Sequence, residues 1–185
     1  MKLYENKTFY LRENKTGQEH YGCRFRYVFG KDCIRFYFDI KDEEIISPYK
    51  EDNEDIWKGD AAEVFISPDG DLTRYKEIEV SPFGVRFYGE VTNEDGKTPR
   101  LRKMEPPFKA ETKLTEYGYT ASIYLALKVM NGFDRKKMKM NAFCLDKKKS
   151  GIQELYALNP TFCGSFHRPK YFVSEGSKHR WTENC

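Results

Sequence analysis

Apolar and polar side chains alternate along most of this chain with a period of two, which is the pattern of half-buried β-strands. In the segment CIRFYFDI, residues 33–40, the side chains of Ile34, Phe36, Phe38 and Ile40 share one face. The same kind of pattern recurs in residues 22–29, 61–67, 74–81, 84–91, 107–114, 117–127, 138–146, 152–157 and 170–174. About ten short strands of this kind predict an all-β protein.

Turn-forming residues separate these segments. PDG at residues 68–70, PFG at residues 82–84 and NG at residues 131–132 supply the proline, asparagine and glycine that tight turns use. Residues 125–131 are the one place where we expect a helix, of about one or two turns. We therefore predict a single domain over residues 1–185, an antiparallel, jelly-roll-like β-sandwich.

The composition excludes several classes of protein. Of the 185 residues 33% are charged and 16% are aromatic, so aromatic rings must supply much of the buried area. A net charge of +3, with basic residues spread among acids, gives no support for nucleic-acid binding. No segment approaches the length of a membrane span, and the first residues lack the apolar stretch of a signal peptide. We expect a cytoplasmic protein that binds no membrane, or a secreted one if a leader has been removed.

The cysteines predict neither a disulfide framework nor a zinc site. Five cysteines leave one unpaired, and no C-x-x-C motif occurs. Cys23 and Cys33 flank the turn at residues 29–32. If the strands pair around this turn, Val28 faces Cys33 and Cys23 faces Phe38, so the two sulfurs are not partners.

Trp57 stands apart from the other aromatic residues because it lies on a polar loop, EDIWKGD at residues 54–60. Its indole can stack on the apolar face of a sugar ring. It can also form an aromatic lid on the sandwich edge, with the ring buried and the N–H in water. We carry the stacking interpretation forward and keep the lid as the alternative. Trp181 is expected to be loose or packed on the surface near the end of the chain.

Several elements follow one another in an order that resembles a known family. They are FYFDIKD at 36–42, the tryptophan loop at 51–60, AAEVFISPDGD at 61–71, YKEIEVSPFGV at 75–85, YGYTASIYLAL at 117–127, MKMNAFCLD at 138–146 and YALNPTFCGSFHRPKYFV at 156–173. Over about residues 20–175 the chain resembles the family 9 carbohydrate-binding modules, most closely their free-standing relatives. The resemblance implies a β-sandwich that holds a mono- or oligosaccharide between two aromatic rings, without catalysis.

The resemblance also assigns ligand-binding roles to individual positions. Trp57 and Phe166 correspond to the two stacking rings, Glu63 to a carboxylate on the following strand and Asn141 to a polar position on a late strand. Glu79 aligns where those modules tend to carry an arginine, which changes the hydrogen bonds offered to a ligand. The preference of those modules for glucan chain ends is therefore not transferred.

Several of the ligand-binding candidates also have a purely structural interpretation. Phe166 can belong to an aromatic core, and Glu63 can be a solvated strand residue on the face opposite the apolar one. His167 and Arg168, in the FHRP motif, are further ligand-binding candidates, but they can instead tie the last loop to the backbone.

The resemblance implies no cofactor other than structural calcium, which relatives hold. Asp69 and Asp71 form a weak candidate pair for such an ion. A turn is their first interpretation, because no further oxygen ligands follow at the required spacing.

Three other functions remain open at this stage. Glu63 and Glu79 lie on strands that should be neighbours, and a retaining glycosidase needs two carboxyls about 5–5.5 Å apart. Acids are abundant here, however, so some such pair is expected by chance. The sandwich can also be a scaffold that has lost its sugar slot. A haem-binding relative of the sandwich would need Met138 or Met140 together with His167 as axial ligands.

Overall fold

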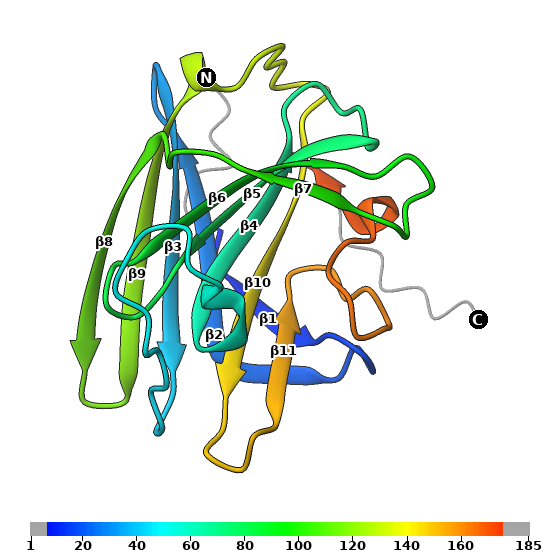
Figure 1. Ribbon diagram of the computed structural model, residues 1–185. Helices are drawn as coiled ribbons and strands as arrows, with labels where there is room; N and C mark the ends of the chain where they lie inside the picture. Colours follow the sequence, from blue (N-terminus) through cyan, green and yellow to red (C-terminus); the bar gives the residue numbers. More distant parts are fainter. Residues whose placement is uncertain (1–6, 176–185) are drawn as a thin grey trace.

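The computed structural model describes residues 7–175, so Trp181 lies outside the described residues. Twelve strands form one antiparallel sheet in the order β7-β6-β5-β4-β10-β11-β1-β2-β3-β9-β8, and β12 pairs with β10 (Figure 1). The strands are β1 (Phe9–Glu13), β2 (Glu19–Phe29), β3 (Cys33–Lys41), β4 (Ala61–Ser67), β5 (Arg74–Val80), β6 (Arg86–Thr92), β7 (Arg100–Lys103), β8 (Phe108–Thr115), β9 (Gly118–Ala126), β10 (Lys139–Lys147), β11 (Gln153–Ala157) and β12 (Val173–Ser174). The all-β prediction is confirmed.

Short 3-10 turns are the only helical structure within residues 7–175: η1 (Ile56–Lys58), η2 (Leu127–Val129) and η3 (Pro169–Tyr171). The helix expected at residues 125–131 is therefore the single turn η2. None of the helices in the described part of the chain is long or apolar enough to cross a membrane.

Two strands escaped the sequence prediction. β7 reads RLRK and all four of its residues are exposed, so no buried alternation marks it. β1 buries only Leu11 fully, and its signal is too short to recognise. The segment predicted as a strand at residues 170–174 contains η3 and only the two residues of β12.

The predicted pairing of β2 with β3 is wrong by two residues. Phe29 pairs with Ile34 and Cys23 pairs with Ile40. The backbone N–H of Gly30 donates to the carbonyl of Cys33 (2.8 Å), which closes a tighter loop than we assumed. Cys23 and Cys33 are still not opposite each other, and both are free thiols.

The sheet curls into two layers around a large apolar core. In Figure 1 strands β4, β5 and β6 run at an angle to β3, β9 and β8. Phe36 and Phe38 of β3 and Val64 and Ile66 of β4 belong to one buried cluster between these layers. The apolar faces predicted for residues 33–40 and 61–67 are therefore both confirmed.

The outer face of β4 is buried as well, since all seven residues of this strand are buried. Phe65 of β4 joins Phe143, Phe166 and Phe172 in a second apolar cluster. The chain after β11, orange in Figure 1, runs on the same side of the molecule as β7. This second covered face is where the candidate site lies.

Candidate functional site

A cleft of ≈ 390 Å³ opens on the outer face of β4 and β5. Its lining includes Trp57, Glu63, Phe65, Glu77, Phe166 and His167. Four residues that the sequence singled out, Trp57, Glu63, Phe166 and His167, are thus brought to one place from three separate segments. Their chemistry combines apolar rings with buried polar groups, which is the usual character of a small-molecule site.

Strand pairing explains why acidic and aromatic side chains meet at the floor of the cleft. Glu63 pairs with Glu79 across β4 and β5, and Phe65 pairs with Glu77. On the other edge of β4, Phe143 of β10 lies opposite Glu63. Directly paired residues of an antiparallel sheet project to the same face, so all five side chains point to the outer side. The expectation that the strands of Glu63 and Glu79 are neighbours is confirmed.

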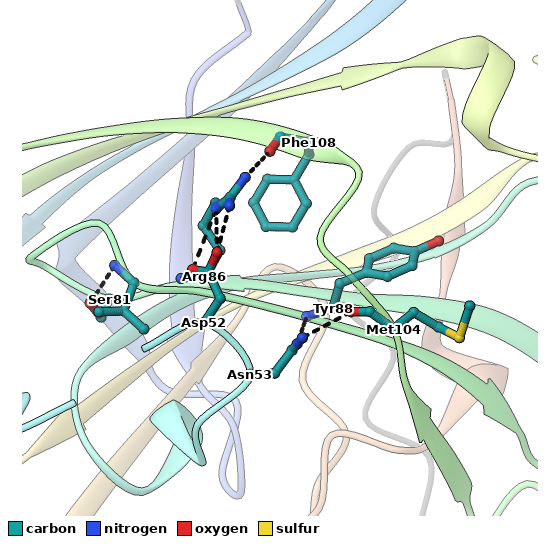
Figure 2. A network of polar contacts seen from close by, with 8 residues as sticks. Asp52, Asn53, Ser81, Arg86, Tyr88, Met104 and Phe108 are labelled. Carbon is teal, nitrogen blue, oxygen red and sulfur yellow. Dashed lines mark hydrogen bonds and ion pairs between the residues drawn. The ribbon is translucent and has the colours of Figure 1, made fainter. Parts of the chain in front are cut away.

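The loop that carries Trp57 is held by a polar clamp, shown in Figure 2. The Arg86 guanidinium binds the Asp52 carboxylate through Nη2–Oδ2 (2.5 Å) and Nε–Oδ2 (3.1 Å). Asn53 donates from Nδ2 to the Met104 carbonyl (3.0 Å) and accepts from the Tyr88 N–H (3.1 Å). Side-chain bonds to β6 and to the chain after β7 therefore fix the loop before any ligand arrives.

The indole of Trp57 is half-buried and lies edge-on to Phe87, with ring centroids 5.1 Å apart and planes at 77°. The ammonium groups of Lys103 and Lys58 lie 5.1 and 5.9 Å from the indole centroid. Asp55 binds both of them, at 2.9 Å to Lys103 and 2.7 Å to Lys58. Within residues 7–175 no aromatic ring stacks parallel to the indole.

Phe166 forms a more enclosed part of the lining. Its ring stacks on Phe143, with centroids 4.0 Å apart and planes at 15°, and only 8% of the residue is exposed. One face of the Phe166 ring is therefore already occupied. Trp57 packs against the same apolar cluster, so the two rings border one cleft, but they are not equally open platforms.

Three carboxyl groups gather at the floor. Oxygens of Glu63, Glu77 and Glu79 lie within 4.8 Å of one another, and all three residues are buried. When all are ionised, Glu63 Oε2, Glu77 Oε2 and both oxygens of Glu79 lack a hydrogen-bond donor. Sequence reasoning missed Glu77, although the period of two in β5 places it on the same face as Glu79.

Burial raises the pKa of each of these glutamates, because the charged form loses its water. The pKa of Glu77 rises to about 7. The pKa values of Glu63 and Glu79 rise well above the ordinary range through burial and then through their acidic neighbours. A proton on Glu79 also makes a hydrogen bond to Glu77, which helps to hold the pKa of Glu79 high.

His167 brings a neutral ring to the cleft. Its Nδ1 lies 2.9 Å from the Tyr75 hydroxyl, and its ring stacks on Phe65 with centroids 4.9 Å apart. Burial, and secondarily the adjacent Arg168, lowers the pKa of His167 to about 4. The Nε2 atom is 3.8 Å from Oε2 of Glu77, but an uncharged imidazole does not neutralise that acid.

Three of the predicted ligand-binding residues, Glu79, Asn141 and Arg168, lie outside the lining of the cleft. Asn141 is fully buried, donates to the Asn159 carbonyl (2.8 Å) and accepts from the Asn159 N–H (3.0 Å). Arg168 donates to the Lys97 carbonyl (3.2 Å). Both side chains hold the segment after β11 in place, and neither lines the cleft; for Arg168 this is the structural alternative of a residue that ties the last loop to the backbone. Glu79 lies beneath Glu63 and Glu77 and does not itself line the cleft.

Two further lining residues had no recognisable signal in the sequence. Gln153 donates from Nε2 to the carbonyls of Trp57 (2.7 Å) and Gly59 (3.1 Å), which ties η1 to the start of β11. Leu101 of β7 lies over Gly89, where an added Cβ would clash with the Cδ1 atom of Leu101. Neither contact can be read from local pattern, because Gln153 and Trp57 are 96 residues apart and the Leu101 contact depends on β7, a strand that no alternation marks.

The similarity of the chain to known proteins agrees with this geometry. A family model described as "Carbohydrate family 9 binding domain-like" matches residues 3–172. The chain belongs to this family. The resemblance inferred from the tryptophan loop and the FHRP segment is therefore confirmed over nearly the whole sequence.

Solved structures share the fold of this family 9 domain. A putative carbohydrate-binding protein from Bacteroides uniformis is 18% identical with a TM-score of 0.73, over 90% of this chain and 84% of that chain. A family 9 carbohydrate-binding module from Caldicellulosiruptor kristjanssonii in complex with cellotriose is 12% identical, with a TM-score of 0.64 over 96% and 87%. A module from the same organism in complex with glucose is 13% identical, with a TM-score of 0.58 over 89% and 82%. No curated protein matches the chain.

The turn residues Asp69 and Asp71 do not fit a calcium site in this family 9 domain. Asp69 Oδ1 accepts from the Asp71 N–H (3.0 Å), and Asp71 Oδ1 accepts from the Thr73 N–H (3.0 Å). Arg74 also binds the Asp71 carboxylate. These oxygens therefore serve the turn, as their first interpretation held.

A second acidic cluster has the oxygen donors that calcium prefers. Carboxylate oxygens of Asp42, Asp60 and Asp146 lie within 4.8 Å of one another. Asp42 Oδ2 and Asp146 Oδ1 are buried without a partner. Burial, together with the two neighbouring acids, raises the pKa of Asp60 to about 7. Among the described residues these three fit a structural calcium ion better than the turn does.

The haem hypothesis is wrong, because the candidate axial ligands lie on opposite faces of the sheet. Met138 and Met140 belong to the apolar core between the two layers. His167 stacks on Phe65, which lies on the outer face of β4. The sheet itself separates the thioethers from the imidazole, so they cannot ligate one iron.

Proposed function

We propose that this family 9 domain binds a mono- or oligosaccharide in the cleft beside Trp57 and does not hydrolyse it. One observation carries the proposal: a half-buried indole on a clamped loop borders a cleft whose floor holds unpaired carboxyl oxygens. Structures of the same fold that are complexes with cellotriose and glucose support a saccharide as the ligand.

The chemistry of a pyranose suits such a cleft. The C–H face of the sugar packs on an aromatic ring, as apolar groups generally do. The hydroxyl rim donates hydrogen bonds, and Glu63 Oε2 and Glu77 Oε2 have no donor from the protein. A hydroxyl that reaches either oxygen relieves a buried polar group, which is worth about 1–3 kcal/mol.

The geometry favours binding over hydrolysis. A glycosidase needs two carboxyls on the scissile bond, one of them ionised. Glu79, the proposed partner of Glu63, has no exposed surface and does not line the cleft. Burial also raises the pKa of each member of the trio Glu63, Glu77 and Glu79. No member of this glutamate trio is therefore set apart as an ionised nucleophile.

Tryptophan fluorescence tests the proposal directly, because the chain has only two tryptophans. In a Trp181→Phe background, titration with mono- and oligosaccharides should shift the emission of Trp57. Trp57→Ala should weaken binding by about tenfold or more, since stacking of this kind contributes about 1–2 kcal/mol.

Tyr117→Ala is the matched control, because Tyr117 is an exposed ring in the turn between β8 and β9. It should leave the affinity unchanged. If the folded protein ignores a broad panel of sugars at millimolar concentration, the proposal fails and a scaffold role takes its place. If aryl glycosides are turned over and Glu63→Gln abolishes turnover, the protein is an enzyme.

A further inference from the structure

The three glutamates of the cleft differ from the other acids of the surrounding sheet. Glu90, on the next strand, binds Lys76 at 2.5 Å and also binds Arg102. Asp52 is paired with Arg86. For Glu63 and Glu79 no ion pair occurs within residues 7–175, and the partner of Glu77 is the imidazole of His167. When these buried carboxyls are ionised, no cation within residues 7–175 therefore pairs with Glu63 or Glu79, and only the imidazole of His167 lies near Glu77.

The charged groups closest to the trio do not supply that cation. His167 is uncharged near neutral pH because burial lowers its pKa to about 4. Lys103 lowers the pKa values of Glu77 and Glu79, but by less than burial raises them. Its ammonium donates instead to the Asn53 carbonyl and to Asp55 Oδ1, both at 2.9 Å. The clamp loop thus holds Lys103 away from the trio.

The trio can be reached by a ligand. Glu63 and Glu77 line the cleft directly, while 2% and 4% of these residues remain exposed. Their unpaired Oε2 atoms are acceptors without donors. Neutral hydroxyls would satisfy only the hydrogen bonds, whereas an ammonium group offers three donors and a positive charge that also stabilises the ionised form of Glu63 and Glu77.

The remaining lining indicates what carries the ammonium. Trp57, Phe65 and Phe166 provide apolar surface beside the acids. A bare metal ion would make no use of these rings, but a pyranose would. The cleft volume of ≈ 390 Å³ is also in the range of small-molecule sites rather than of a single ion.

We propose that the saccharide of this cleft is an amino sugar, whose ammonium group binds between Glu63 and Glu77 while its ring packs beside Trp57. This inference rests on the proposed function and narrows it to a class of ligand. Acetylated or neutral sugars of the same shape lack the charge and should bind more weakly.

Calorimetry with three matched sugars tests the inference. Glucosamine, N-acetylglucosamine and glucose are compared at about pH 7, close to the pKa of Glu77, together with deacetylated chitin oligosaccharides and cellotriose. We expect the amino sugars to bind about tenfold or more tightly than their neutral counterparts, the scale of a charge-assisted hydrogen bond. The preference should shrink as sodium chloride is added.

Glu77→Gln keeps the shape of the side chain and removes its charge. It should abolish most of the preference for glucosamine over glucose, while Glu111→Gln, at an exposed site on β8, should leave the preference intact. If Glu77→Gln does not fold, the comparison of the three sugars on the unmodified protein still tests whether the cleft prefers an amino sugar.

The outcomes separate the two proposals. Equal or tighter binding of glucose overturns the amino-sugar inference but leaves saccharide binding standing. Equal loss of glucose and glucosamine in Glu77→Gln also overturns it, because the charge would then not be what is recognised. Binding of calcium or manganese at the trio without any preference for amino sugars overturns it as well. If no sugar binds, saccharide binding itself fails.

Discussion

Glu79 is a fully buried acid beneath the cleft, and neither of its carboxylate oxygens has a hydrogen-bond partner when it is ionised. Its place opposite Glu63 follows from the strand pattern, and the structure confirms the pairing. Its environment does not follow, since full burial beneath the cleft depends on the loops that cover the outer face. A buried acid with unpaired oxygens is a cost to the fold, and such costs are common where a protein holds a ligand.

Replacing Glu79 should therefore stabilise the protein. Glu79→Met keeps the volume and removes the buried oxygens, so we expect the free energy of unfolding at about pH 8 to rise by about 1–3 kcal/mol. Urea denaturation measures the change, with Glu111→Gln as the exposed control. A loss of stability would contradict this prediction, because it would mean that the Glu79 carboxyl makes stabilising hydrogen bonds in the folded protein.

At the scale of elements, the site depends on segments that cover the second face of the sheet. The loop before β4 carries Trp57 and is clamped to β6 by Arg86 and Asp52. The segment after β11 carries Phe166 and is held by Asn141. These contacts lie outside the cleft, yet they determine the positions of Trp57 and Phe166, which line it.

Loosening the clamp should weaken binding without unfolding the sandwich. Asp52→Ala removes the partly exposed ion pair with Arg86, so we expect less than about 1 kcal/mol of lost stability but several-fold weaker sugar binding. Thermal unfolding and calorimetry on the same samples measure both effects. The matched control is Glu94→Ala, which removes the exposed pair with Arg100 and should change neither. An unchanged affinity in Asp52→Ala would show that the loop needs no clamp.

For the whole molecule, the buried acids make stability depend on pH in an unusual direction. In the unfolded chain Glu77 titrates near 4.5, and in the folded protein its pKa is about 7. The folded state thus binds more protons between these values, and stability falls as pH rises through this window. The lowered pKa of His167 has the opposite effect, because it makes stability rise with pH, but only between pH 4 and pH 6.5, its folded pKa of about 4 and its ordinary pKa.

We therefore expect the melting temperature to fall between pH 6.5 and about pH 8. In this range His167 no longer contributes to the pH dependence of stability, and the buried glutamates lose their protons. Calorimetric melting across this range measures the slope. Glu63→Gln combined with Glu77→Gln should flatten it, and because Asp60 acts in the same direction, the difference between the two proteins isolates the glutamates. A slope that is unchanged in the double variant would contradict the assignment.

Much of the architecture was readable from the sequence because alternation is a local property. The core faces of residues 33–40 and 61–67, the turns and the tryptophan loop all follow from neighbouring side chains. The strand β7 was not readable, since all its residues are exposed and nothing in RLRK distinguishes it from a loop. The register of β2 and β3 was missed because it depends on the loop geometry at Gly30.

Local pattern and the family resemblance were enough to predict the fold class and the family, and they singled out Trp57, Glu63, Phe166 and His167 as candidates, which the fold places around one cleft. The packing of distant segments decided that Glu77 lines the floor and that Glu79, Asn141 and Arg168 lie outside the lining. The reason is physical. A strand pattern states which face a side chain takes, but whether that face is dry, charged or covered depends on segments that arrive from elsewhere in the chain.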